Sequence, residues 1–261
     1  MAAVPVALTV AGSDPSGGAG IQADLKTFHQ HGVYGASVVS LLTVQNTREV
    51  SRVEVLDPSL VREQLLAVLD DLPVAAIKTG ALGSAEIVRA VAQCLADRGL
   101  PLVIDPVRIA KHGAALLGDE AREVMLEELV PGCALLTPNR DEAAWLSGQA
   151  VDDVRHARRA AEALLRRGAS AVLLKGGHLP GDEVVDLLCT DDEVFELSAP
   201  RLHVGDTHGL GCTLSAAITA RMARGEALAD ACREATAWLR RTMQSAPGLG
   251  GGVGPVNHLA K

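Results

Sequence analysis

The sequence predicts an α/β fold in which helices cover both faces of a mostly parallel sheet. Short apolar runs alternate with helical patterns over nearly the whole 261-residue chain, as in strands joined by crossover helices. Hydrophobic residues make up 48 %, yet the chain has only two Trp, one Tyr and two Phe, so Ala, Val and Leu must form the core. We find no repeat or linker and expect a single domain over residues 1–261.

Strands are predicted from short apolar runs at residues 4–11, 37–43, 74–78, 102–105, 133–136 and 171–174, with two neighbouring strands at 182–190 and 193–197. Helices are predicted from apolar spacing at residues 21–31, 58–72, 85–98, 120–129, 141–147, 154–167 and 228–244, with one more beginning near Cys212. Taken alone, the glycine-rich tail at 248–254 suggests a flexible terminus.

The chain is organised around residues 206–215, where two glycines precede a run of small residues compatible with a helix. A glycine turn that opens a helix directs backbone N–H groups and the positive end of the helix dipole toward one point, which suits an anion. Cys212 would stand in the first helical turn, a position that lowers a thiol pKa. This stretch predicts either a phosphoryl-transfer site or a glycine-started helix with a small buried Cys.

Charge and cysteine content exclude several classes of protein. The formal charge of −8 and the lack of a basic cluster argue against a nucleic-acid partner. Five widely spaced cysteines without a C-x-x-C pair argue against a zinc or redox motif and favour reduced thiols. No basic N-terminal segment and no apolar run of about 18 residues is present, so we expect a cytoplasmic protein without a membrane partner.

Polar residues collect where the predicted strands end, at the edge where ligands bind in such sheets. They are Asp14, Gln45, Lys78, Asp105, Asn139 and Lys175. Gln45 offers a donor and an acceptor for a heterocycle, or is part of a polar turn. Asn139 and Glu142, one helical turn apart, suit Mg²⁺ held through water, or Asn139 is only an N-cap. The loop after the first strand matches the dinucleotide fingerprint only loosely, and no P-loop is present.

At these residues the sequence resembles the hydroxymethylpyrimidine/phosphomethylpyrimidine kinases of thiamine biosynthesis, in the ribokinase-like superfamily. The resemblance covers essentially the whole chain. It is carried by residues 10–14, 16–26, 45–47, 104–107, 137–139 with Glu142 and Ala143, 174–178, 207–209, 211–218 and 254–258.

The resemblance implies a three-layer α/β/α domain without a β-lid, commonly a homodimer, that uses ATP and Mg²⁺. It implies phosphorylation of 4-amino-5-hydroxymethyl-2-methylpyrimidine and then of its monophosphate. The implied pyrimidine contacts are Gly12, Asp24, Gln45 and Val107. Gly209, Gly211 and Cys212 would form an anion hole, and Cys212 would stand where sugar kinases carry an Asp base. Lys175, with Gly177, Thr207 and Gly209, would bind ATP, and Asn139 and Glu142 would manage the metal.

The chain departs from the family pattern at Leu210, Arg108, His112, Ala81 and Asp206. Leu210 removes a hydroxyl from the anion hole but leaves its N–H donors. Arg108 is expected either near the cavity mouth, where it would favour the monophosphate, or on the surface. Residues 109–119 are the candidate for a mobile loop over the site. Two alternatives stay open: a pyridoxal/pyridoxine kinase, and a non-catalytic pyrimidine-binding protein, which Leu210 favours.

Overall fold

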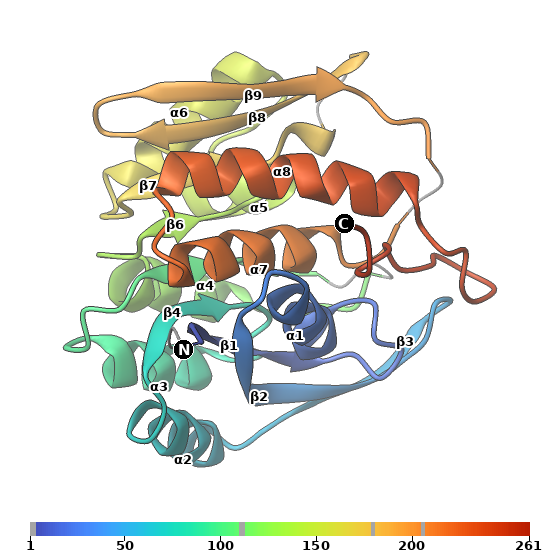
Figure 1. The fold of residues 1–261 in the computed structure, drawn as a ribbon. Coiled ribbons are helices and arrows are strands. Elements are labelled where there is room, and N and C mark those ends of the chain that lie inside the picture. The colour runs from blue at the N-terminus through green and yellow to red at the C-terminus, as the bar shows by residue number, and fades with distance from the viewer. Residues whose placement is uncertain (1–3, 110–112, 179–180, 205–206) are drawn as a thin grey trace.

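A nine-stranded sheet forms the middle layer of the molecule (Figure 1). The computed structural model describes residues 4–109, 113–178, 181–204 and 207–261. The strand order is β3-β2-β1-β4-β5-β6-β7-β8-β9. Strands β2, β1, β4, β5, β6 and β7 are parallel to one another. Strand β3 is antiparallel to β2, and β8 and β9 form an antiparallel hairpin beside β7.

The strands are β1 Val6–Ser13, β2 Tyr34–Gln45, β3 Val50–Val55, β4 Val74–Thr79, β5 Leu102–Ile104, β6 Leu135–Leu136, β7 Ala171–Leu174, β8 Glu183–Thr190 and β9 Val194–Pro200. The helices are α1 Gly20–Gln30, α2 Pro58–Leu69, α3 Ala85–Leu95, α4 Asp119–Val124, α5 Arg140–Ser147, α6 Val154–Leu165, α7 Leu210–Ala223 and α8 Leu228–Gln244. A π-helical turn, Met125–Leu129, extends α4, and a 3₁₀ turn, Gly176–His178, follows β7.

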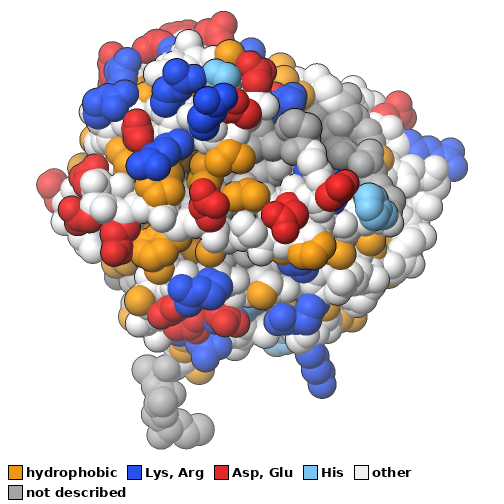
Figure 2. Space-filling model, turned by 90° about the horizontal axis from the view of Figure 1, so that it is seen from above, with side chains coloured by type: hydrophobic (Ala, Val, Ile, Leu, Met, Phe, Trp, Pro, Cys, Tyr) orange, Lys and Arg blue, Asp and Glu red, His pale blue; other side chains and the backbone are white. Residues whose placement is uncertain are grey.

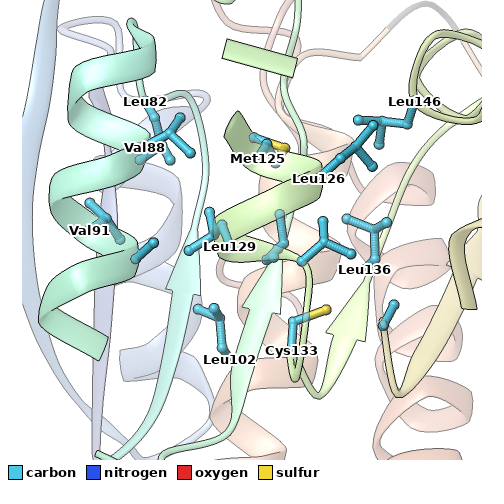
Figure 3. Packing of buried hydrophobic residues seen from close by; sticks show 14 of the residues in the cluster. Leu82, Val88, Val91, Leu102, Met125, Leu126, Leu129, Cys133, Leu136 and Leu146 are labelled. Atoms are coloured by element: carbon cyan, nitrogen blue, oxygen red, sulfur yellow. The ribbon is translucent and has the colours of Figure 1, made fainter. Parts of the chain in front are cut away.

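Side chains that alternate along each central strand pack against the helices on the two faces of the sheet. In β5, Leu102 and Ile104 point to the face covered by α2 to α6, while Val103 points to the face covered by α7 and α8. Figure 3 shows the packing on the first of these faces, where Leu129 of the π-helical turn lies toward Val91 of α3 and Leu126 lies toward Leu146 of α5. Burial on both faces explains why these strands read as continuous apolar runs.

Helix α7 is buried on all sides from Thr213 to Ala220. It packs on β4, β1 and β5 and lies between α1 and α8 (Figure 1). Alanines make up much of these contacts, with Ala216 and Ala220 of α7 in one cluster with Ala7 of β1 and Ala76 of β4. Small side chains let a helix approach the sheet closely, so the alanine-rich composition brings the start of α7 to the middle of the sheet edge.

The predicted α/β/α architecture is confirmed, with two differences. The edge strand β3 was not predicted, because half of its pattern is polar and most of its residues are exposed. The glycine-rich tail is docked on the protein, which corrects the expected flexible terminus. Val253 N–H donates to the Thr47 carbonyl, and His208 N–H donates to the Gly254 carbonyl. That residues 1–261 form a single domain stays a prediction.

Figure 2 shows one outer face of the molecule, where Lys and Arg side chains lie next to Asp and Glu, with hydrophobic side chains between them. On this face the basic groups are therefore accompanied by acidic ones. Among the described residues, no helix is both long and apolar enough to cross a lipid bilayer.

Candidate active site

A cavity of about 490 Å³ lies at the carboxyl edge of the sheet, where α7 begins. Its wall comes from segments far apart in the sequence: the β1–α1 loop, the ends of β2, β5 and β7, the start of α5, the first turn of α7, and the β8–β9 hairpin with α8. The predicted residues Gly12, Gln45, Val107, Asn139, Glu142, Lys175, Gly177, Thr207, Gly209, Gly211 and Cys212 all line it. The fold therefore brings every predicted site residue except Asp24 to one cavity.

Two helices begin side by side at this cavity. Gly209 caps α7 with φ 83°, and α1 begins at Gly20 with φ 58°, both in the left-handed region that favours glycine. A Cβ on Gly209 would overlap the Gly18 carbonyl, and one on Gly20 would overlap the Gly12 carbonyl. The glycines thus allow both positive helix ends to face the same space, which favours an anion there.

A partly buried lysine, Lys175, stands next to the α7 terminus with two carboxylates. Lys175 Nζ lies 3.1 Å from Asp105 Oδ1 and 3.8 Å from Glu142 Oε2. Burial works against the charge on Lys175, but Asp105 and Glu142 raise its pKa well above the usual value. A Cβ on Gly211 would lie 3.2 Å from Lys175 Nζ, so the ammonium group sits directly against the first turn of α7.

Asn139 and Glu142 form a capping box at the start of α5. The Asn139 oxygen accepts from the N–H groups of Asp141 and Glu142, both at 2.9 Å, and Glu142 Oε2 accepts from Asn139 N–H at 2.7 Å. Burial raises the pKa of Glu142 to about 7; Lys175 opposes the rise and Asp105 adds to it. Asn139 is therefore the N-cap of α5, and its amide oxygen accepts two backbone hydrogen bonds.

The described residues contain no cluster of three or more His, Cys, Asp or Glu side chains suited to a metal ion. Glu142 lines the cavity, and its Oε2 is the oxygen used in the capping box. A carboxylate beside substrate phosphates is the kind of ligand that Mg²⁺ takes, directly or through water. That Asn139 and Glu142 manage such an ion stays a prediction.

Cys212 lies in the first turn of α7, partly exposed toward the cavity. The lowered thiol pKa expected from the helix terminus is wrong. Burial raises the pKa of the Cys212 thiol to about 11; Lys78 opposes this rise, while Asp105 and Asp24 add to it. Loss of water and two nearby carboxylates thus outweigh the helix dipole and the lysine.

Asp24 does not line the cavity, contrary to its predicted contact with substrate. Its carboxylate is fully buried and accepts two hydrogen bonds from Lys78 Nζ, each 2.7 Å, and one from Thr9 Oγ1, also 2.7 Å. Burial opposes the charge on Lys78, yet Asp24 raises the Lys78 pKa above its usual value. Asp24 therefore holds a cation beneath Cys212, and no direct substrate contact is assigned to it.

An apolar pocket lies at the β1–β2 side of the cavity, with Gln45 at its edge. Gly12, Leu41, Ala81, Val107, Ile109 and Leu116 line it. A Cβ on Gly12 would lie 2.5 Å from Leu41 Cδ1, so glycine is required for Leu41 to pack there. The apolar lining and the donor and acceptor of the Gln45 amide suit a heterocycle.

Arg108 does not line the cavity, although Val107 and Ile109 do. The Arg108 guanidinium instead lies 5.2 Å from the centre of the Trp145 ring, a cation–π contact. Arg108 is thus half-buried against Trp145, and its expected effect on the choice of substrate stays a prediction.

The far part of the cavity is mostly apolar. Val184, Leu197, Ala199, Leu214, Leu239 and Met243 line it. Gly177 and Thr207 also line the cavity. Thr236 also lines the cavity, and its buried hydroxyl has no hydrogen-bond partner in the structure. This part is suited to an adenine ring and ribose.

Two side chains at the cavity, Asp14 and His208, make contacts that the sequence does not predict. The sequence shows Asp14 only as a polar strand end and His208 only as part of a motif. His208 Nε2 lies 3.1 Å from Asp14 Oδ2 and 2.8 Å from Gln45 Nε2, so the three side chains form one group. A buried His in contact with a loop carboxylate cannot be predicted from spacing, because 194 residues separate the pair.

Asp206 and His112, two of the departures from the family pattern, lie outside the described residues. The predicted mobile loop, 109–119, falls partly there too.

Comparison with known proteins assigns the family. The sequence profile of the family described as phosphomethylpyrimidine kinase matches residues 14–257. The chain belongs to this family. It is 48 % identical to the hydroxymethylpyrimidine/phosphomethylpyrimidine kinase of Streptomyces coelicolor, over 97 % of this chain and 94 % of that one. It is 44 % identical to the Escherichia coli protein of the same name, over 97 % of both chains.

Two solved kinase structures have the same fold as this chain. The Bacillus subtilis pyridoxal kinase in an ADP complex superposes with a TM-score of 0.92 and 35 % identity, covering 99 % of this chain and 98 % of that one. The phosphomethylpyrimidine kinase of Clostridium difficile 630 superposes with a TM-score of 0.80 and 39 % identity, covering 90 % and 98 %.

Replacing Lys78 should destabilise the fold. Lys78→Met leaves the Asp24 carboxylate buried without its cation, which costs about 3–5 kcal/mol. We expect urea unfolding to show a loss of this size. The double variant Lys78→Met/Asp24→Leu removes both charges and should regain a large part of it. A single variant within about 1 kcal/mol of wild type would contradict the buried pair.

Glu142 should make stability depend on pH. Its pKa is raised from 4.5 to about 7 in the folded protein, so the folded state binds the proton more tightly than the unfolded one. The stabilisation from this group is complete below about pH 4.5 and is lost as the pH rises through 7. We expect the free energy of unfolding of Glu142→Gln to be about 2–3 kcal/mol larger than that of wild type at pH 8.5. The variant should therefore be the more stable protein at this pH.

The stability gained by Glu142→Gln should be smaller at pH 5.5 than at pH 8.5. As a control, Glu63→Gln, at an exposed position on α2, should have the same stability relative to wild type at both pH values. A Glu142→Gln variant less stable than wild type at pH 8.5 would show that ionised Glu142 supports the fold.

Proposed function

We propose that the protein transfers the γ-phosphoryl group of ATP to the hydroxymethyl group of 4-amino-5-hydroxymethyl-2-methylpyrimidine, and then to the resulting monophosphate, in thiamine biosynthesis. The observation that carries the proposal is the meeting of the two helix N-termini with Lys175 in one cavity that also has apolar lining. The relatives named hydroxymethylpyrimidine/phosphomethylpyrimidine kinase support the same reaction, and ADP in a structural neighbour supports ATP as donor.

Charge stabilisation is the main task of the site. Phosphoryl transfer proceeds through a loose transition state with negative charge spread over the phosphoryl oxygens. N–H groups at Gly209, Gly211 and Cys212 would donate to these oxygens, and Lys175 would supply a full positive charge beside them. Mg²⁺, held by Glu142 through water and by the ATP phosphates, would neutralise further charge when bound.

Cys212 would accept the proton of the hydroxymethyl group in the first transfer. The substrate oxygen forms its bond to phosphorus while the bond to ADP breaks, and the hydroxyl proton passes to the ionised Cys212 sulfur. Since the thiol pKa lies near 11, only a small fraction is ionised at neutral pH. In the second transfer the nucleophile is a phosphate oxygen, which needs no base.

Gly12, Gln45 and Val107 would hold the pyrimidine ring, and Gly177 and Thr207 would lie along ATP. The finer expectations from the family stay predictions: a homodimer, a cytoplasmic location and the Mg²⁺ requirement.

The second candidate is a pyridoxal kinase, favoured by the superposition on the Bacillus subtilis enzyme. The edge presented by Gln45, with one donor and one acceptor, suits an aminopyrimidine better than the phenolic oxygen of pyridoxal. A non-catalytic pyrimidine-binding protein is the candidate of another class, and the nearby Lys175, Glu142 and Cys212 speak against it.

Product analysis tests the proposal. Purified protein is incubated with ATP, Mg²⁺ and hydroxymethylpyrimidine, and in parallel with pyridoxal, and the products are identified by mass spectrometry. We expect the pyrimidine mono- and diphosphate, with Mg²⁺ required. Pyridoxal phosphate alone would assign the protein to vitamin B6 salvage, and no product in either tube would favour the binding protein.

Cys212→Ala in the same assay isolates the proton transfer. It should slow the first step about 100-fold, and leave the second within about threefold. Equal losses in the two steps would contradict Cys212 as the base.

A further inference from the structure

The orientation of the Gln45 amide is decided by its two neighbours. The nitrogen lies 2.8 Å from His208 Nε2, and the oxygen lies 3.2 Å from Thr43 Oγ1. The two ends of a side-chain amide have nearly the same shape, so partners rather than shape decide which end is oxygen. Each neighbour of Gln45 gives an independent test.

Thr43 requires a donor from Gln45. Its hydroxyl carries one proton, which it gives to the Ser13 carbonyl at 2.9 Å, a group that can only accept. Toward Gln45, Thr43 Oγ1 therefore has only a lone pair. The end of the amide that faces Thr43 must be the NH₂ group.

His208 requires an acceptor from Gln45. Its Nε2 lies 3.1 Å from Asp14 Oδ2. Asp14 is ionised at neutral pH: burial opposes its charge, but hydrogen bonds from His208 and Ser16 lower its pKa to about 2. A carboxylate oxygen can only accept, so His208 Nε2 must carry a proton. The amide end that faces this N–H must be the oxygen.

We propose that Asp14 and His208 are positioning residues, which fix the Gln45 amide with its oxygen toward His208 and its nitrogen toward Thr43. The proposal rests on the proposed function in one respect, the pyrimidine substrate. The aminopyrimidine edge offers a ring-nitrogen acceptor beside an exocyclic amine donor. The amine must then lie on the His208 side, and the ring nitrogen on the Thr43 side.

This orientation places the reacting group correctly. The hydroxymethyl carbon is bonded to the ring atom next to the one bearing the amine, so it extends past His208. The residue after His208 is Gly209, where the N-terminus of α7 begins. The opposite amide orientation would direct the hydroxymethyl group toward Thr43, away from Cys212. The proton on His208 thus selects the productive pose.

Nitrogen-15 NMR of histidine-labelled protein tests the proton directly. The His208 signals are assigned by their loss in His208→Gln. We expect a protonated Nε2 in the ligand-free protein. A His208 in which only Nδ1 carries a proton would overturn the proposal, whatever the substrate proves to be. A failure of the proposed function would appear separately, as absence of pyrimidine phosphates in the wild-type assay.

Kinetics test the consequence. His208→Leu removes the N–H and should raise the KM for hydroxymethylpyrimidine at least about tenfold, with the KM for ATP within about threefold of wild type. His208→Gln restores a side-chain N–H and should return the pyrimidine KM to within about threefold. His258→Leu removes another buried imidazole, one that contacts Thr213, and should leave the pyrimidine KM unchanged. Equal impairment in His208→Gln and His208→Leu would overturn the positioning role.

Discussion

The structure depends on the close approach of two helix N-termini at the edge of the sheet. Helices α1 and α7 start side by side only because Gly20 and Gly209 adopt left-handed backbone angles and leave no Cβ against neighbouring carbonyls. Alanines beneath α7 let it lie close on β1 and β4. Two positive helix ends then require anionic partners. Two ion pairs lie beside these helix ends, Lys175 with Asp105 and Lys78 with Asp24.

These balanced pairs explain how the site is charged yet stable. Each lysine is buried against a carboxylate, so its ammonium group is held in place before a phosphate arrives. Such preorganisation reduces the rearrangement needed when negative charge develops. Glu142 is the exception. Burial raises the pKa of its carboxyl group to about 7, so its ionised form is less favourable in the folded protein than in water. A site that tolerates such a group is typical of function rather than of stability.

Much of this could be predicted from the sequence, because strand ends and glycine turns are local signals. The alternation of strands and helices predicted the sheet, and polar residues at strand ends predicted the edge where the cavity lies. What could not be predicted depends on three-dimensional neighbours. The Cys212 pKa follows from burial beside Asp105 and Asp24, and the position of Asp24 follows from its pairing with Lys78. The proposed role of His208 depends on its contact with Asp14, in a loop 194 residues away in the sequence.

Gly211→Ala tests most directly the claim that the α7 terminus and Lys175 together stabilise the transferred phosphoryl group. The added methyl would lie 3.2 Å from Lys175 Nζ and 3.3 Å from Asp105 Oδ2, while Gly211 has no positive φ that alanine would strain. We predict that kcat for pyrimidine phosphorylation falls at least about 100-fold, with stability unchanged. Gly118→Ala, in open space at the start of α4, should keep wild-type activity. A Gly211→Ala variant within about threefold of wild type would contradict the account.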